Sequence, residues 1–189
     1  MGVIVLDDNG DGQLKGIIEI CKSSSCSSGA KLRGAHYAAG RMLAVKIAER
    51  EKIKHGVAVV IMMRAGLPFG LGIADKMEEC RLSVDVFFND DTDRLEPDNY
   101  EKIIFVDAVV RTGKAISLLA DSVAGEWSDK IVFATNVLDH TGASGFVDRT
   151  LYAVRVSGNS YKGTSLKTIE GGKGPDTGDR LFFSDFYRQ

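Results

Sequence analysis

The stretch from Ile103 to Ser117 combines residue types that suit the binding of a phosphorylated ribose. Its apolar start predicts a buried strand that delivers Asp107 to the carboxyl edge of a sheet, where open α/β sheets bind ligands. A loop then leads to a helix predicted to begin at Lys114, whose first amides lack intrahelical acceptors and can bind an anion. Thr112 adds a hydroxyl donor, and Gly113 allows close approach of the backbone to a phosphate. The carboxylate of Asp107 can accept hydrogen bonds from vicinal ribose hydroxyls.

Two other interpretations of this stretch stay open. A strand, an Asp, a short loop and a helix also form an ordinary connection in α/β proteins without any ligand. In the second interpretation, the stretch is a phosphate-binding motif of another kind, although neither Gly-x-x-x-x-Gly-Lys-Ser/Thr nor Gly-x-Gly-x-x-Gly occurs in the chain.

The elements that must position this stretch follow from the pattern of apolar residues. A long amphipathic helix is predicted from Lys31 to Lys52, and short apolar strands then alternate with helices. The predicted strands are 57–63, 84–88, 103–106, 131–138 and 151–156, and the predicted helices between them include 67–77 and 114–123. Unbroken apolar strands that alternate with helices indicate the α/β class, with a parallel sheet flanked by helices on both faces. We expect a single domain over residues 1–189 that ends in a Gly-rich flap.

Composition argues against several classes of partner. The chain has 189 residues and a formal net charge of −2, so no basic field favours nucleic acid or an anionic membrane. Its three cysteines form no Cys-x-x-Cys pair, which suits reduced thiols in the cytoplasm. Neither a signal peptide nor a membrane span is expected from the sequence. We therefore predict a cytoplasmic protein that binds neither nucleic acid nor membranes.

Five stretches in order along the chain resemble one enzyme family. Ile103 to Ser117 resembles the phosphoribosyl pyrophosphate loop of type I phosphoribosyltransferases, and four further stretches are similar to those of uracil phosphoribosyltransferases. These four are Gly40-Arg41-Met42-Leu43-Ala44, Met63-Arg64-Ala65-Gly66-Leu67, the acidic stretch from Asp90 to Pro97, and Asp176-Thr177-Gly178-Asp179-Arg180-Leu181-Phe182. One such match is weak, but five in the family's order are a specific signal.

The resemblance implies a fold and a reaction. It implies the type I phosphoribosyltransferase fold, with a small hood built from about residues 1–35 and 157–189, and a homodimer. It also implies transfer of the 5-phosphoribosyl group from phosphoribosyl pyrophosphate to a pyrimidine base. We expect this base to be uracil, and the products would then be UMP and pyrophosphate. Mg²⁺ is the implied cofactor, bound mostly by water and substrate phosphates.

The resemblance also implies roles for individual residues. Arg64, Asp107 and Asp179 would be the catalytic residues, with Asp179 also the candidate Mg²⁺ ligand. The implied pyrophosphate-binding residues are Arg64, Ala65 and Gly66; those that bind the ribose and 5-phosphate are Asp107, Arg111, Thr112, Gly113, Lys114 and Ala115; and those near the base, the ribose and Mg²⁺ are Asp176, Thr177, Gly178 and Asp179.

Departures from the family pattern leave the acceptor open. Ala108, Arg111 and Lys114 stand where the family loop has Pro, Ala and a second Gly. Glu170 to Pro175 replaces the segment through which the family reads uracil, largely by backbone groups. Two alternatives follow: a transferase of the same fold with a different acceptor base, and a non-catalytic regulatory protein that binds a nucleotide or phosphoribosyl pyrophosphate.

Overall fold

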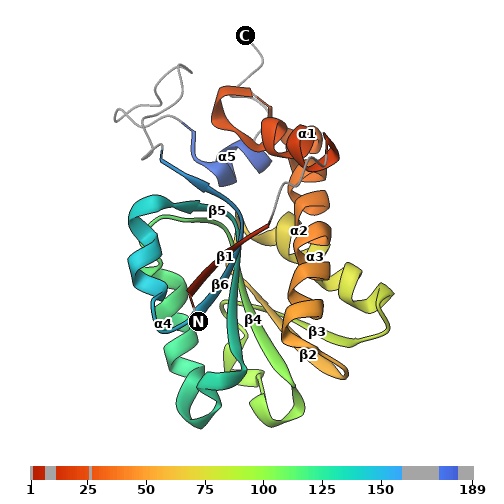
Figure 1. Cartoon of the computed structure of the whole chain (residues 1–189), viewed down its shortest axis with the longest axis vertical. Coiled ribbons are helices and arrows are strands. Elements are labelled where there is room, and N and C mark those ends of the chain that lie inside the picture. The colour runs from red at the N-terminus through yellow and green to blue at the C-terminus, as the bar shows by residue number, and fades with distance from the viewer. Residues whose placement is uncertain (1, 7–11, 26, 159–174, 183–189) are drawn as a thin grey trace.

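The computed structural model describes residues 2–6, 12–25, 27–158 and 175–182 (Figure 1). Its centre is a six-stranded sheet in which every pair of neighbours is parallel, in the order β1-β6-β5-β4-β2-β3. Helices flank this sheet on both faces, which confirms the predicted fold class. The strands are β1 (Gly2–Val5), β2 (Gly56–Ile61), β3 (Ser83–Phe88), β4 (Lys102–Val110), β5 (Ile131–Asp139) and β6 (Thr150–Ser157).

The helices connect successive strands or cover the carboxyl edge of the sheet (Figure 1). The α-helices are α1 (Gly12–Cys21), α2 (Gly29–Glu51), α3 (Leu67–Glu79), α4 (Lys114–Ala124) and α5 (Thr177–Phe182). The short 3₁₀ segments are η1 (Ser23–Ser25), η2 (Thr92–Arg94), η3 (Pro97–Asn99), η4 (Gly125–Lys130) and η5 (His140–Phe146).

Each strand of the sheet interior buries side chains on both faces. In β2, Val57, Val59 and Ile61 pack with α2 and α3 in one apolar cluster. Ala58 and Val60, which alternate with them, pack with α4 and η5 in a second cluster. The period of two along a pleated strand produces this division, and burial on both faces explains why these strands are continuous apolar runs.

Glycines allow α2 and α3 to pack very closely. A Cβ atom at Gly40 would lie 2.1 Å from the carbonyl oxygen of Phe69, and one at Gly72 would lie 2.1 Å from that of Tyr37. The backbones of the two helices therefore touch at both positions. This contact gives a structural reason for the glycine that opens the Gly40-Arg41-Met42-Leu43-Ala44 motif.

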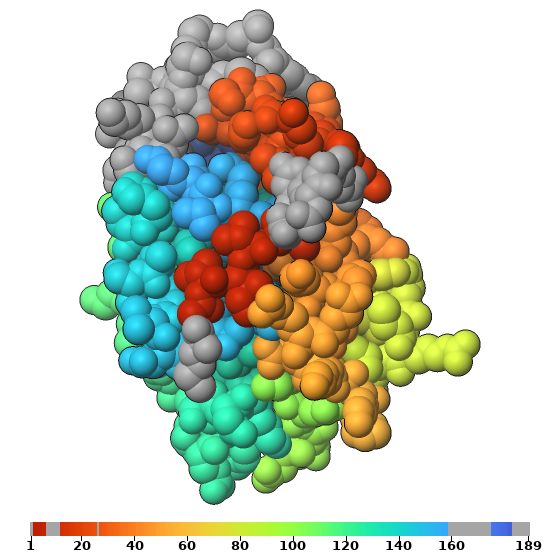
Figure 2. Space-filling view, viewed as in Figure 1, coloured from red at the N-terminus to blue at the C-terminus, as the bar shows by residue number. Residues whose placement is uncertain are grey.

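Three elements differ from the sequence predictions. β1 was not predicted because it has only four residues; it pairs with β6 at the edge of the sheet and lies on the surface beside α2 (Figure 2). Helix α1 was not predicted either, although Leu14 and Ile17 give it a buried face. The predicted loop 107–113 is wrong in its first part, because β4 continues to Val110 and pairs with β5. Residues 108–110 are apolar and β-branched or small, which suits a strand.

Helix α5 and the segment after α1 form a cap over the carboxyl ends of the strands (Figure 1). The buried guanidinium of Arg180 donates from Nη2 to the carbonyl oxygens of Lys22 and Ser27, both at 3.0 Å. Arg33 on α2 donates to the carbonyl of Leu181 at 2.6 Å. We call α1, η1 and residues 175–182 the cap. The wider hood predicted from residues 1–35 and 157–189 stays a prediction, since 159–174 and 183–189 lie outside the described residues.

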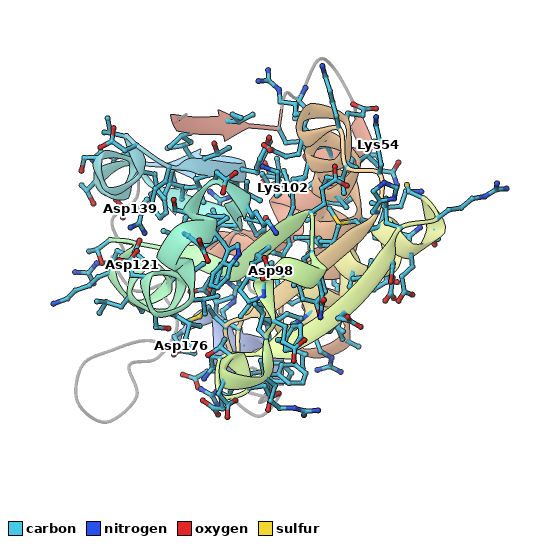
Figure 3. The ribbon with its side chains drawn as sticks, turned by 90° about the horizontal axis from the view of Figure 1, so that it is seen from below. Lys54, Asp98, Lys102, Asp121, Asp139 and Asp176 are labelled. Carbon is cyan, nitrogen blue, oxygen red and sulfur yellow. The ribbon has the colours of Figure 1, made fainter. Side chains whose placement is uncertain are left out.

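The amino ends of the strands are tied by a separate set of polar contacts. Lys102, at the start of β4, pairs with Glu51 at 3.0 Å and donates to the carbonyl of Asp129 (Figure 3). Trp127 donates from its indole to Asp98 at 2.8 Å. No helix among the described residues is long and apolar enough to cross a membrane.

Candidate functional site

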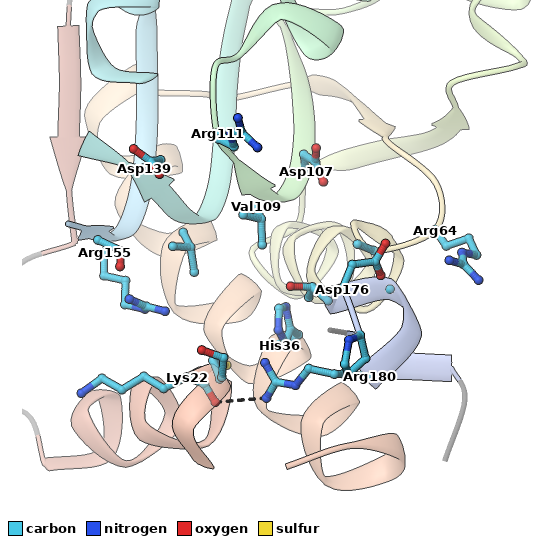
Figure 4. A pocket seen from close by; sticks show the side chains of 18 of the residues that line it. Lys22, His36, Arg64, Asp107, Val109, Arg111, Asp139, Arg155, Asp176 and Arg180 are labelled. Carbon is cyan, nitrogen blue, oxygen red and sulfur yellow. Dashed lines mark hydrogen bonds between the residues drawn. The ribbon is translucent and has the colours of Figure 1, made fainter. Parts of the chain in front are cut away.

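A cavity of about 720 Å³ lies between the carboxyl ends of the strands and the cap (Figure 4). Strands β4, β5 and β6 line it through pairs of alternate residues, Asp107 with Val109, Val137 with Asp139, and Arg155 with Ser157. The loop after β2 contributes residues 63–65, and the cap contributes residues 21–24, 175–178 and Arg180. This is the edge where open parallel sheets bind ligands.

The loop after β2 presents Arg64 and Ala65 to the cavity. The peptide bond between Met63 and Arg64 is cis, and the Met63 N–H donates to Asn89 Oδ1 at 2.9 Å. Gly66 does not line the cavity. It is buried, and a Cβ atom there would lie 2.5 Å from the carbonyl oxygen of Met62. Gly66 thus has a packing role in this loop, whereas the side chain of Arg64 lines the cavity.

The C-terminal motif forms the first turn of α5 and contacts Arg64. Asp176 Oδ1 accepts from the Asp179 N–H at 2.7 Å, and Asp179 Oδ2 accepts from the Asp176 N–H at 3.2 Å. This reciprocal pair caps the helix amino terminus. The remaining oxygen of Asp179 lies 3.1 Å from Arg64 Nη2. Asp176, Thr177 and Gly178 line the cavity, whereas Asp179 does not.

Asp107 lies within β4 and faces the cavity (Figure 4). Burial raises the pKa of its carboxyl to about 6, although the backbone N–H groups of Val109 and Ala108 favour the charged form. Near neutral pH the group is therefore a partly buried carboxylate that can accept hydrogen bonds from hydroxyl groups.

The connection from β4 to α4 is a tight turn. Gly113 has a φ of 74°, and a Cβ atom there would lie 2.6 Å from the ring of Phe146. Thr112 Oγ1 accepts from the N–H of Lys114 at 3.4 Å. Arg111 lines the cavity, and Thr112, Gly113, Lys114 and Ala115 lie next to it without lining it. Their predicted contact with a 5-phosphate stays a prediction.

Sequence reasoning missed His36 as a cavity residue. Its ring is 1% exposed, and its Nδ1 lies 3.2 Å from Nδ2 of Asn136. Burial, and then the charges of Arg180 and Arg155, lower the pKa of His36 to about 4, so its ring is neutral near pH 7. A sequence signal existed, because His36 follows Leu32 by four residues and so shares the apolar face of its helix.

Other residues of the cavity wall were also missed. Arg155 interrupts the apolar run of β6, and Asp139 ends β5. Asp139 accepts from both the N–H and the hydroxyl of Thr141, and these bonds lower the pKa of its carboxyl. Cys21 and Lys22 come from the end of α1, which had not been predicted as a helix. Burial raises the pKa of the Cys21 thiol, which makes it a poor nucleophile.

The candidate metal ligand Asp179 is already paired with Arg64. Within the described ranges, no group of three or more His, Cys, Asp or Glu side chains could hold a metal ion. A metal that takes most of its ligands from water and a bound phosphate would not need such a group. The donor set of this cavity therefore fits a metal that arrives with its substrate better than a resident ion.

The cavity joins guanidinium groups with carboxylates, a combination suited to a ligand that has both phosphates and hydroxyls. Arg64 and Arg111 can neutralise phosphate oxygens, and Asp107 can accept from hydroxyls. The cap lies over this edge of the sheet and contributes residues 21–24, 175–178 and Arg180 to the cavity wall.

No protein-family model matches this sequence, and no curated protein matches it significantly. Among solved structures, the chain is similar to the AQ2163 protein from Aquifex aeolicus, with a TM-score of 0.66 and 16% identity over 95% of this chain and 97% of that one. It is also similar to the HGPRT-ase from Leishmania tarentolae in complex with GMP, with a TM-score of 0.51 and 16% identity over 67% of this chain and 79% of that one. At such identities the likeness shows the fold alone. The chain has a phosphoribosyltransferase-like α/β fold.

Proposed function

We propose that this protein transfers the 5-phosphoribosyl group of phosphoribosyl pyrophosphate to a ring nitrogen of a pyrimidine or related heterocycle. Uracil is the acceptor that the sequence resemblance implies, and UMP would then be the product. The observation that carries this proposal is that one cavity gathers Arg64, Asp107 and Asp176 from three separate motifs. Ligand binding at this edge of the sheet is the rule for open α/β folds.

Each wall of the cavity suits one part of phosphoribosyl pyrophosphate. Asp107 accepts from the ribose hydroxyls, and Arg64 binds the pyrophosphate. Arg111, with Thr112 and the amides at the start of α4, binds the 5-phosphate. These assignments place the ribose between the strand ends and the cap.

The reaction needs no nucleophilic side chain. The bond from the ribose carbon C1′ to pyrophosphate breaks with its electron pair on the leaving oxygen, and the acceptor nitrogen forms a bond to C1′. An acceptor nitrogen that carries a proton releases it to water or to the departing pyrophosphate. The protein contributes by holding the two reactants together and by stabilising the charge of the leaving pyrophosphate with Arg64. Mg²⁺ bound to the substrate phosphates would neutralise further charge, and Asp179, which also pairs with Arg64, is the candidate protein ligand for that ion.

A homodimer, a cytoplasmic location and the absence of nucleic-acid partners are part of the same proposal. The net charge of −2 supports the last of these, because nucleic-acid binding requires a concentration of basic residues. The resemblance to a usually dimeric family supports the dimer.

Pyrophosphate release tests the proposed function. The full chain is mixed with phosphoribosyl pyrophosphate and Mg²⁺, and release is measured with uracil, other pyrimidines, purines and carboxylated heterocycles in turn. Release that requires an acceptor supports the transferase. Binding of phosphoribosyl pyrophosphate without release for any acceptor would contradict it and favour a regulatory binding protein.

A further inference from the structure

Arg155 places a positive charge in the cavity wall at the end of β6. The residues before it in this strand, from Leu151 to Val154, are buried and apolar, and Arg155 is the first to reach the cavity (Figure 4). Its Nε is buried and has no hydrogen-bond partner among the described residues. No described carboxylate forms an ion pair with it. A partly buried cation without a counter-ion is unfavourable unless a ligand supplies one.

His36 provides a second donor at the same wall. Asn136 Nδ2 can only donate, so His36 Nδ1 accepts and the neutral ring has its proton on Nε2. This Nε2 is buried and has no partner among the described residues. Both residues line the same cavity, His36 from α2 and Arg155 from β6, and the charge of Arg155 contributes to the lowered pKa of His36. The cavity lining therefore includes a guanidinium Nε and an imidazole Nε2 that have no acceptor among the described residues.

The nearby carboxylates of the described chain are engaged elsewhere. Asp139 accepts from Thr141, and Asp176 accepts from the N–H of Asp179. Glu19, whose charge acts on Arg155, pairs with Lys22 at 2.5 Å. Among the described residues, no acceptor lies within hydrogen-bonding distance of Arg155 Nε or His36 Nε2, and a ligand in the cavity can supply one.

We propose that the acceptor heterocycle bears a carboxylate, which Arg155 binds with its guanidinium and His36 binds through Nε2. This inference rests on the proposed function and specifies its substrate class. A neutral base such as uracil can offer a carbonyl oxygen to His36 but leaves the charge of Arg155 without a counter-ion. A carboxylate satisfies both groups, and its bond to a guanidinium is of the stronger, charge-assisted kind. A site with buried donors typically rejects a substrate that lacks the acceptor group these donors need, because they are then left unpaired.

The test compares acceptors that differ only in the carboxylate. Pyrophosphate release is measured with uracil against 6-carboxyuracil (orotate) and 5-carboxyuracil, and with nicotinamide against nicotinate. At least one carboxylated member should exceed its neutral partner in kcat/KM by on the order of 100-fold. Binding of the same compounds in the presence of pyrophosphate and Mg²⁺ is measured by calorimetry, so that an acceptor that binds without turnover is also detected.

Variants of Arg155 test whether its guanidinium causes the preference for carboxylated acceptors. Arg155→Gln should lower kcat/KM for the carboxylated acceptor on the order of 100-fold, and change that for a neutral acceptor by less than about threefold. Arg155→Lys should restore part of the loss, since it keeps the charge. Arg149→Gln is the matched control, because Arg149 lies at the other end of β6, pairs with Asp121 and should leave both values unchanged. An unchanged dissociation constant for phosphoribosyl pyrophosphate shows that the Arg155 variants are folded.

The outcomes separate this inference from the proposed function. Turnover of uracil that exceeds that of every carboxylated compound would overturn the inference and leave the transferase intact. Equal loss for both classes of acceptor in Arg155→Gln would also overturn it. Failure to bind phosphoribosyl pyrophosphate would overturn the proposed function, whereas binding of a carboxylated heterocycle that Arg155→Gln abolishes would still support the anion site.

Discussion

The guanidinium of Arg64 lies 3.1 Å from the carboxylate of Asp179, and this ion pair joins the loop after β2 to helix α5 in the cap. Arg64 is also close to Gly178, where a Cβ atom would lie 3.5 Å from Nη2. The residue proposed to bind pyrophosphate is therefore held by the residue proposed to lie near the base. The guanidinium has five N–H donors, so it can bind a pyrophosphate and keep its contact with the Asp179 carboxylate in the cap.

Replacement of Arg64 by Gln should weaken binding far more than folding. The ion pair is exposed, with side-chain accessibilities of 48% for Arg64 and 22% for Asp179. Such pairs contribute less than about 1 kcal/mol to the free energy of unfolding. Loss of the guanidinium should lower affinity for pyrophosphate on the order of 10- to 100-fold, measured by calorimetry. Arg50→Gln, at an exposed position of α2, is the control; equal affinity in Arg64→Gln and wild type would contradict the assignment.

Replacement of Arg180 by Leu should detach the cap. Its buried guanidinium bonds to the carbonyl oxygens of Lys22 and Ser27, which are left without these donors in the variant. We expect the free energy of unfolding to fall by about 2–4 kcal/mol, because hydrogen bonds to buried charged groups are among the stronger ones. Urea denaturation measures the loss, with Arg50→Gln, at an exposed position of α2, as the control. A change below about 0.5 kcal/mol would show that these bonds do not hold the cap.

Replacement of Gly113 by Ala should distort the turn before α4. The positive φ of 74° and the ring of Phe146, 2.6 Å from the position of a Cβ atom, both oppose a side chain. We expect a loss of about 1–3 kcal/mol in the free energy of unfolding and weaker binding of phosphoribosyl pyrophosphate. Gly34→Ala is the matched control, since nothing lies within 4 Å of its Cβ position in α2. Equal effects of the two substitutions would contradict a special role for the turn.

The raised pKa of the Asp107 carboxyl predicts how the free energy of unfolding depends on pH. Burial raises its folded-state pKa from 3.8 to about 6, so the folded protein binds this proton more tightly than the unfolded chain does. The stability that this proton contributes is present at low pH and is lost as the pH rises through about 4 to 6. Asp107→Asn has no charge to bury and should lack this loss.

Thermal unfolding at several pH values tests this prediction. The melting temperature of Asp107→Asn should exceed that of wild type most above about pH 7 and least near pH 4. A difference that does not change with pH would show that burial does not perturb this carboxyl. The comparison is made without ligand, because the same substitution should weaken substrate binding.

Much of the fold follows from local sequence. The strands from Val57 and from Ile103 begin as unbroken apolar runs because both of their faces are buried, and this pattern predicts a parallel sheet between helices. β1 has too few residues to show a pattern. The end of β4 was misplaced because a ligand loop was expected after Asp107, whereas Val109 and Val110, which are β-branched, pair with β5.

The candidate site was predictable only where its residues form local motifs. Arg64 and Asp107 each follow an unbroken run of apolar residues, which marks them as residues near the carboxyl edge of the sheet. His36 and Arg155 come from different elements, and nothing near either in sequence indicates that both reach one cavity. Asp179 was predicted from its motif to bind a ligand, but the geometry also gives it a capping role and an ion pair that only the folded chain creates.

Calorimetric titration with phosphoribosyl pyrophosphate and Mg²⁺ tests the central claim most directly. The account predicts saturable binding to the wild-type chain and an affinity lower by about 10- to 100-fold in Asp107→Asn, because a charge-assisted acceptor for the ribose hydroxyls is lost. Absence of binding by the wild type, or equal affinity in the two proteins, would contradict the assignment of this cavity to phosphoribosyl pyrophosphate.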